Sequence, residues 1–313
     1  MYNFLYCFDE NYNIPASCSI YSLLETFDEK INIYIMHKNF STSDFLPKKI
    51  LNHNMLNEVN VSKVNLKGLE FPNILGTHVS EATYYRLFLQ DYLVDDIDTI
   101  TYLDCDVFSI NNPKSYIKKT VSKMNENNNI ISVAPENTLF DYGRKQLKLK
   151  SDKYFNAGVM IINLKEWKKS NLKASFINVL NEFEENLLFW DQDVLNITFD
   201  GNYEILDKNM NYKVDMEADN TSYKIDEQME SEIRLLHYSG KFKPWTVKGA
   251  INDNAEYFQN IYRQLFNKKY YFSFNYKVNA LNDLKQTISN KTIFNSKYPV
   301  YFFMYTLKKL LKK

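Results

Sequence analysis

The chain has 313 residues, of which 45% are hydrophobic, and its 38 basic residues balance its 38 acidic ones. This length allows a large core, no stretch reaches the about 20 apolar residues of a membrane-spanning helix, and Asp9 and Glu10 stand where a signal peptide would be apolar. The three cysteines (Cys7, Cys18 and Cys105) form no disulfide or metal-knot spacing, so we expect a protein of a reducing compartment, the cytoplasm.

The first elements predict a β-α-β unit. Residues 3–8 are apolar enough for a strand, residues 19–27 have helical periodicity, and residues 31–36 form a second apolar run. A β-α-β start is typical of an α/β fold with a mostly parallel sheet and crossover helices.

The loop after the first strand carries polar side chains and no glycine. Because the first glycine is Gly68, this loop cannot be a glycine-rich phosphate-binding loop. A nucleotide bound here would be contacted by side chains such as Asp9 and Asn11. The alternative, with equal weight, is that both residues belong to a turn that caps the next helix.

Residues 39–57 are expected to form a helical connection and residues 59–66 a strand. A helix is predicted over residues 78–89, with Ser80 as its cap. Arg86 on that helix would pair with a surface acid or brace the carboxylates of the next motif. His78 is as readily a surface residue as a functional one.

A buried strand over residues 97–103 leads into two carboxylates, Asp104 and Asp106. If the strand continued, both side chains would point to the same face, since side chains alternate with period two. Two carboxylates at the carboxyl end of a central strand suit a divalent cation, and ligands bind at that end of open α/β sheets. Taken alone, the motif is more often a turn or a helix cap.

A helix is expected over residues 113–124, a strand over 130–134, and a mobile loop beside the site over 138–153. Gly158 at the start of the next apolar run indicates a close approach to the backbone. Asn156 in front of it would either bind a hydroxylated substrate or form a turn.

The last elements of the α/β region are a helix at 172–188, a helical start at 190–196, and strands at 203–206 and 233–236. Asp191 is placed as a helix cap, although the polar run with Gln192 is longer than a cap requires. His237 follows the last strand as a candidate metal ligand, and Gly240 and Lys243 beyond it would receive a phosphate. A lone histidine is more often structural, but the preceding aspartates favour the metal site.

The segment from Lys268 to Lys313 holds ten lysines and one acid, Asp283, so it carries +9 and the rest of the chain −9. Its last helix places apolar side chains on one stripe, which are Val300, Phe303, Met304, Leu307 and Leu311. This pattern fits an anionic membrane surface. Nucleic-acid binding, or a helix that packs on the main domain, are the alternatives.

Six motifs occur in an order that resembles the family-8 retaining glycosyltransferases, and among them the bacterial lipopolysaccharide galactosyltransferases. They are Phe8-Asp9-Glu10-Asn11-Tyr12, Ala82-Thr83-Tyr84-Tyr85-Arg86-Leu87, Tyr102-Leu103-Asp104-Cys105-Asp106-Val107, Tyr154-Phe155-Asn156-Ala157-Gly158-Val159, Asp191-Gln192-Asp193-Val194-Leu195-Asn196 and His237 to Trp245. The resemblance runs from about Asn3 to Trp245.

The resemblance implies a glycosyltransferase-A fold, Rossmann-like, in a catalytic domain over 1–265, with a basic aromatic tail over 266–313. It implies Mn²⁺, or Mg²⁺, on Asp104, Asp106 and His237. The implied nucleotide-sugar contacts are Cys7, Asp9, Asn11, Tyr12, Cys105, Ala157, Gly240 and Lys243, and the implied sugar-handling residues are Arg86, Asn156, Asp191 and Gln192. Ser239 departs from the cysteine that relatives often have, which leaves a small polar group beside the phosphates.

The implied reaction moves galactose or glucose from a UDP-sugar to a glycan or glycolipid acceptor in cell-surface polysaccharide synthesis, with retained configuration and no nucleic-acid partner. A neutral amide at Gln192 is a poor nucleophile, which favours attack by the acceptor on the leaving-group face over double displacement. The rivals are a metal-dependent sugar nucleotidyltransferase, which generally needs a glycine-rich loop after the first strand, and a membrane-attached sugar-nucleotide binding protein without turnover.

Overall fold

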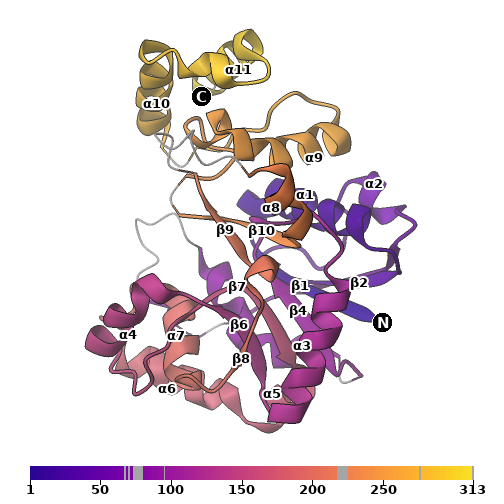
Figure 1. Cartoon of the computed structure of the whole chain (residues 1–313), viewed down its shortest axis with the longest axis vertical. Coiled ribbons are helices and arrows are strands. Elements are labelled where there is room, and N and C mark those ends of the chain that lie inside the picture. The colour runs from indigo at the N-terminus through magenta and orange to yellow at the C-terminus, as the bar shows by residue number, and fades with distance from the viewer. Residues whose placement is uncertain are drawn as a thin grey trace.

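A seven-stranded sheet forms the centre of the molecule (Figure 1). A computed structural model of the chain describes residues 1–66, 68–69, 71–72, 80–94, 96–216, 225–240, 242–274 and 276–311. In spatial order the strands are β3 (Leu56–Lys63), β2 (Ile31–His37), β1 (Tyr2–Phe8), β4 (Thr99–Leu103), β7 (Phe155–Asn163), β6 (Ile131–Pro135) and β8 (Glu204–Ile205). Only β7 runs antiparallel to its two neighbours, and the other pairs are parallel. The predicted α/β fold with a mostly parallel sheet is confirmed.

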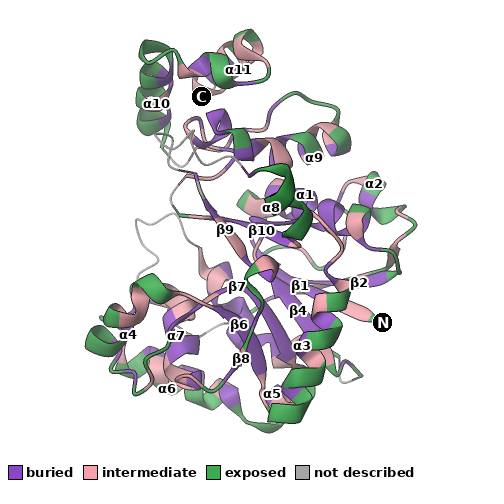
Figure 2. Ribbon diagram, in the orientation of Figure 1, coloured by how far each residue is buried: buried purple, intermediate pink, exposed green. Residues whose placement is uncertain are grey.

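Helices cover both faces of this sheet, so its central strands are buried on both sides (Figure 2). Every residue of β2 is buried, as expected for a strand with two covered faces. One face packs against α1 (Asn13–Thr26), α3 (Lys114–Asn127) and α9 (Glu256–Phe266). The other face packs against the 3-10 segment η2 (Glu81–Asp91), α5 (Leu164–Lys169), α6 (Leu172–Glu182) and α7 (Trp190–Phe199).

Shorter helical elements lie in the connections. They are α2 (Lys48–Leu51), α4 (Phe140–Gln146), α8 (Glu227–Glu232), η1 (Glu10–Tyr12), η3 (Asn137–Leu139), η4 (Lys208–Met210), η5 (Gly249–Ile251), η6 (Asp253–Ala255) and η7 (Thr292–Asn295).

A second sheet of three strands brings two distant parts of the chain to the end of β4. Its strands are β5 (Val107–Ser109), β10 (Leu235–Ser239) and β9 (Tyr212–Asp215), in that spatial order. Strand β10 runs antiparallel to β5, with His237 opposite Val107. Since Val107 directly follows Asp106, this register places His237 beside the aspartates.

The C-terminal helices α10 (Lys277–Ser289) and α11 (Pro299–Leu311) form a lobe above the sheet (Figure 1). The lobe has its own small core, in which Phe302 lies edge-on to Phe272 with ring centroids 4.9 Å apart. This core also includes Val247, Ala250 and Ile251, so the tail packs on residues that precede position 266. No helix in the described part of the chain is long and apolar enough to cross a membrane.

Helix α11 turns part of the predicted apolar stripe outward. It buries Phe302 and Thr306, while Val300, Met304 and Leu311 are 78%, 59% and 74% exposed. The tail therefore packs on the main body, which was one of the alternatives to membrane binding. It still presents apolar side chains to solvent.

Several predicted elements differ in length or type. The prediction of a helix over 39–57 is wrong except for the short helix α2. Pro47 and the polar run at Asn52–Asn54 interrupt the helical stretch, and β3 begins at Leu56. The expected loop over 138–153 contains α4, and the long helix over 172–188 ends at Glu182.

Ser80 caps η2 as predicted, by accepting a hydrogen bond from the Ala82 amide, but the helix it caps is 3-10. The strand that was expected to carry Asp104 and Asp106 ends at Leu103. Strand β9 was not predicted, since its four residues are too few to show a period.

Candidate active site

A cavity of about 230 Å³ opens where β1 and β4 end and β5 begins. This is the edge of the sheet at which the sequence predicted a site. Most of the predicted site residues line it, namely Cys7, Asp9, Tyr12, Arg86, Asp104, Cys105, Asp106, Asn156, Asp191, Gln192, His237, Gly240 and Lys243.

Two predicted residues lie beside the cavity and not on its wall. The side chain of Asn11 is exposed, and its backbone amide donates a hydrogen bond to Asp9 Oδ1 over 2.9 Å. Asp9 is therefore a turn-capping residue and a lining residue at once. Ala157 contributes its backbone, which binds Gln192 and Arg86. His78 and Lys241 lie outside the described residues.

Asp104, Asp106 and His237 converge although the aspartates leave the strand. They lie in a tight turn in which the Val107 amide donates to the Asp104 carbonyl over 3.1 Å. One potential ligand atom from each residue lies within 4.8 Å of the others. The turn and the pairing of β5 with β10 bring the three residues together. The alternation of side chains along a continuing strand plays no part in this.

The Asp106 carboxylate is buried, and only one of its two oxygens has a close partner. Its Oδ2 pairs with Lys243 Nζ over 2.7 Å. Its Oδ1 accepts no hydrogen bond from the described residues and lies 3.4 Å from His237 Nε2. Burial alone would raise the pKa of Asp106, but Lys243 and His237 outweigh burial and hold that pKa below its usual value.

This donor set fits a divalent cation. A buried carboxylate oxygen without a hydrogen bond costs free energy unless a ligand satisfies it. Two carboxylates and one imidazole are ligand types that Mn²⁺ and other divalent ions accept. The residues present therefore fit the metal that the resemblance implied.

Gly158 leaves room for this cluster. A Cβ on Gly158 would run into the His237 ring and come 3.0 Å from Asp104 Oδ2. The predicted close approach is confirmed, and the groups that approach are two of the candidate metal ligands. Any larger residue here would push them apart.

Arg86 joins the carboxylates of Asp104 and Asp191 into one buried cluster. Of its two predicted roles, this confirms the bracing of the carboxylate motif. Its Nε donates to Asp191 Oδ2, and its Nη1 donates to Asp104 Oδ1 over 3.2 Å and to the Ala157 carbonyl over 2.6 Å. The Tyr102 ring lies under the guanidinium at 4.4 Å, and the Tyr102 hydroxyl donates to Asp104 Oδ1 over 2.5 Å. The arginine side chain is only 6% exposed, so it is not a surface partner.

Asp191 lies in the first turn of α7, and the cap position belongs to Phe189, so its prediction as a helix cap is wrong. The carboxylate pairs with Arg86 instead. Burial raises the pKa of Asp191 to about 6, against the opposing effect of Arg86. A carboxylate held this way has its position fixed by the arginine.

Gln192 has both ends of its amide occupied. Its Oε1 accepts from the Ala157 amide over 3.0 Å, and its Nε2 donates to the Tyr154 hydroxyl over 3.1 Å. The Tyr154 hydroxyl in turn donates to Asp193, which also accepts from Tyr142 on α4 over 2.6 Å. The polar run at Asp191 to Asp193 thus contacts α4 through Tyr142 as well as the cavity wall.

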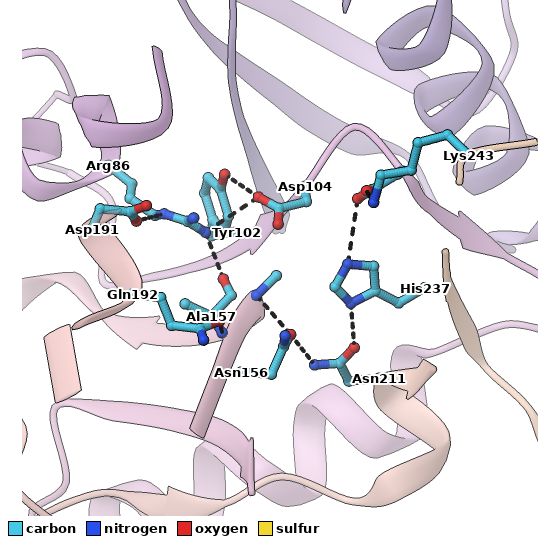
Figure 3. A network of polar contacts seen from close by, with 12 residues as sticks. Arg86, Tyr102, Asp104, Asn156, Ala157, Asp191, Gln192, Asn211, His237 and Lys243 are labelled. Carbon is cyan, nitrogen blue, oxygen red and sulfur yellow. Dashed lines mark hydrogen bonds and ion pairs between the residues drawn. The ribbon is translucent and has the colours of Figure 1, made fainter. Parts of the chain in front are cut away.

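Sequence patterns predict no functional role for three residues that the structure places in or beside the site, namely Tyr102, Asp193 and Asn211. Tyr102 is indistinguishable in sequence from the apolar residues of its strand, and Asp193 is one member of a polar run. Asn211 carries no local signal, and it lies 2.9 Å from His237 Nδ1 and 3.0 Å from Asn156 Oδ1 (Figure 3). The side-chain partners of Asn211 and the two tyrosines that bind Asp193 lie far away in the sequence, whereas Tyr102 binds Asp104 two positions later.

Comparisons with known proteins agree with this geometry. The sequence model described as Glycosyl transferase family 8 matches residues 3–249. A lipopolysaccharide 1,2-glucosyltransferase of Escherichia coli is 28% identical, over 83% of this chain and 78% of its own length. A lipopolysaccharide 1,3-galactosyltransferase of Salmonella typhimurium is 26% identical, over 80% of this chain and 74% of its own length.

A crystal structure of the galactosyltransferase LgtC, in complex with donor and acceptor sugar analogs, shares the fold. It superposes with a TM-score of 0.69 at 21% identity and covers 84% of this chain and 96% of the other.

Proposed function

We propose that this chain, which belongs to glycosyl transferase family 8, moves galactose or glucose from a UDP-sugar to a glycan or glycolipid acceptor in cell-surface polysaccharide synthesis. The names of the two bacterial relatives support a hexose donor and a lipopolysaccharide-like acceptor. The observation that carries the proposal is the cluster of Asp104, Asp106 and His237 in the cavity beside Lys243 and Arg86.

In this proposal the cavity divides into three parts. Asp104, Asp106 and His237 would hold Mn²⁺ or Mg²⁺, which would supply positive charge to neutralise the diphosphate. Cys7, Asp9, Tyr12 and Cys105 form the uridine side, with Asn11 beside it, and Gly240 and Lys243 contact the phosphates. Arg86, Asn156, Asp191 and Gln192, with the Ala157 backbone, form the sugar side.

The reaction breaks the bond between the anomeric carbon and the β-phosphate oxygen, and the electron pair leaves with UDP. Lys243 stabilises the charge that develops on that oxygen, since a positioned cation acts most strongly where charge forms. The acceptor hydroxyl attacks from the same face and gives its proton to the departing phosphate oxygen, so the configuration is retained.

The side chains near the sugar favour this route over a covalent intermediate. The Gln192 amide is neutral and tied at both ends, and the Asp191 carboxylate is held by Arg86. Neither is a free nucleophile. Asp191 and Arg86 instead orient the donor sugar and favour an oxocarbenium-like transition state by their fixed charges.

A panel of UDP-sugars tests this function directly. We expect UDP release from UDP-galactose or UDP-glucose with Mn²⁺, and none with a chelator. A nucleotidyltransferase would instead release pyrophosphate from UTP and a sugar phosphate. Tight UDP-sugar binding by calorimetry without release of UDP, with the chain folded and metal present, would favour the binding protein.

We also propose that residues 266–313 attach the enzyme to the cytoplasmic face of an anionic membrane. The exposed side chains of Val300, Met304 and Leu311 and the exposed basic residue Lys308 near the end of α11 support this. We expect the chain to sediment with vesicles that contain phosphatidylglycerol, less so at high salt, and not with neutral vesicles. The Val300→Ser/Met304→Ser variant should weaken that binding. Equal binding by this variant would contradict the proposal.

A further inference from the structure

We propose that Asn211 is a positioning residue that fixes two other side chains of the site at once. It sets which nitrogen of His237 carries the proton, and it sets which half of the Asn156 amide faces the ligand. The inference rests on the proposed function in that His237 is taken to bind a cation and Asn156 to bind the donor sugar.

Asn211 lies between the cation side and the sugar side of the cavity. It precedes β9, is 3% exposed, and comes from a segment that packs beside β10. Its Nδ2 donates to Asn156 Oδ1 over 3.0 Å, and its Oδ1 lies 2.9 Å from His237 Nδ1. Figure 3 shows the resulting chain of contacts from Asn156 through Asn211 to His237.

The direction of every hydrogen bond in this chain follows from one backbone group. The Gly158 amide donates to Asn156 over 3.0 Å, and a backbone N–H can only donate, so an oxygen of Asn156 must face it. Asn211 approaches that same oxygen and must present its NH₂ group. The Asn211 oxygen therefore faces His237, and His237 Nδ1 must carry a proton to bind it.

The neutral imidazole has one proton, so His237 Nε2 is left with a lone pair. This nitrogen is the one that points toward Asp106 Oδ1, 3.4 Å away. A carboxylate by itself would favour the other tautomer, in which Nε2–H donates to Asp106. Asn211 opposes that preference and keeps the Nε2 lone pair available for a cation, as partners of metal-binding histidines commonly do.

The same bonds orient Asn156. Its Oδ1 is occupied by the Gly158 amide and by Asn211, so its NH₂ group is the half that remains for a ligand. Asn156 is therefore a hydrogen-bond donor toward the cavity, which suits a sugar hydroxyl or phosphate oxygen. Asn211 links this orientation to the tautomer of His237.

Nitrogen NMR on the metal-free protein with ¹⁵N-labelled histidine tests the tautomer without turnover. The chain has four histidines, and the His237→Gln variant identifies the signal of His237. We expect a proton on Nδ1 in the wild-type chain and in Asn211→Asp, whose carboxylate still accepts. In Asn211→Leu the proton should move to Nε2. A wild-type His237 that is protonated on Nε2 would overturn the inference.

Cation and donor binding separate the two roles of Asn211. We expect Asn211→Leu to weaken Mn²⁺ binding by about 10- to 100-fold in calorimetry, as loss of a hydrogen-bond partner behind a metal ligand usually does. Asn211→Asp should keep Mn²⁺ affinity but raise KM for the UDP-sugar, because a carboxylate cannot donate to Asn156. Equal Mn²⁺ affinity in Asn211→Leu and wild type would contradict the proposal.

Asn209→Leu is the matched control. It places the same substitution two residues away, where the described contacts come from the Asn209 backbone, and it should leave the tautomer and Mn²⁺ affinity unchanged. If the wild-type chain bound no cation, the metal-dependent function would fail, while the NMR result would still decide whether Asn211 sets the tautomer.

Discussion

The Asp106→Asn variant is expected to lose divalent-cation binding and to turn over donor about 10²–10³-fold more slowly than wild type. Asp106 offers a buried oxygen that accepts no hydrogen bond from the described residues and lies 3.4 Å from His237 Nε2, so we expect it to be a main ligand of the proposed cation. Asparagine keeps its size and can still accept from Lys243. The variant thus removes the charge with little change in packing.

Calorimetric Mn²⁺ titration and UDP release measure this effect together. Asp98→Asn is a suitable control, because Asp98 is exposed and adjoins the opposite end of β4. It should bind Mn²⁺ and release UDP as wild type does. Unchanged Mn²⁺ affinity in Asp106→Asn would remove this cluster as the metal site.

The Arg86→Met variant is expected to lower the free energy of unfolding by about 3–5 kcal/mol, since loss of one partner leaves a buried charge uncompensated. Asp191 is 2% exposed at its side chain and would be stranded. Asp104 is 30% exposed at its side chain and can be solvated. Urea unfolding measures the loss, and donor turnover should fall with it.

The double variant Arg86→Met/Asp191→Leu separates stability from function. It should recover most of the lost free energy of unfolding, because an apolar pair can replace a buried ion pair. It should remain inactive, since both charges are gone. Arg263→Met is the control, as its partner Glu256 is 43% exposed and such pairs contribute at most about 1 kcal/mol. If Arg86→Met cost no more than Arg263→Met, the buried cluster would not stabilise the fold.

The sequence predicted the identity of the site better than the geometry behind it. Asp104 and Asp106 were expected to share the face of a strand, yet they lie in a turn after Leu103. They still converge with His237, because the chain continues directly into β5, which pairs with β10. Asp191 was wrongly predicted to be a helix cap, because aspartate is common both at helix caps and in buried ion pairs, and the local sequence does not distinguish the two.

Local signals determined the α/β fold, the place of the cavity and most of its lining, since apolar periodicity and strand-end polar residues lie within short stretches of sequence. Ordered motifs added the family. The tertiary structure alone decided that Arg86 pairs with Asp191, 105 positions later, and that Asn211 lies between His237 and Asn156. These choices depend on which strands pair and in what register, and no short stretch of sequence carries that information.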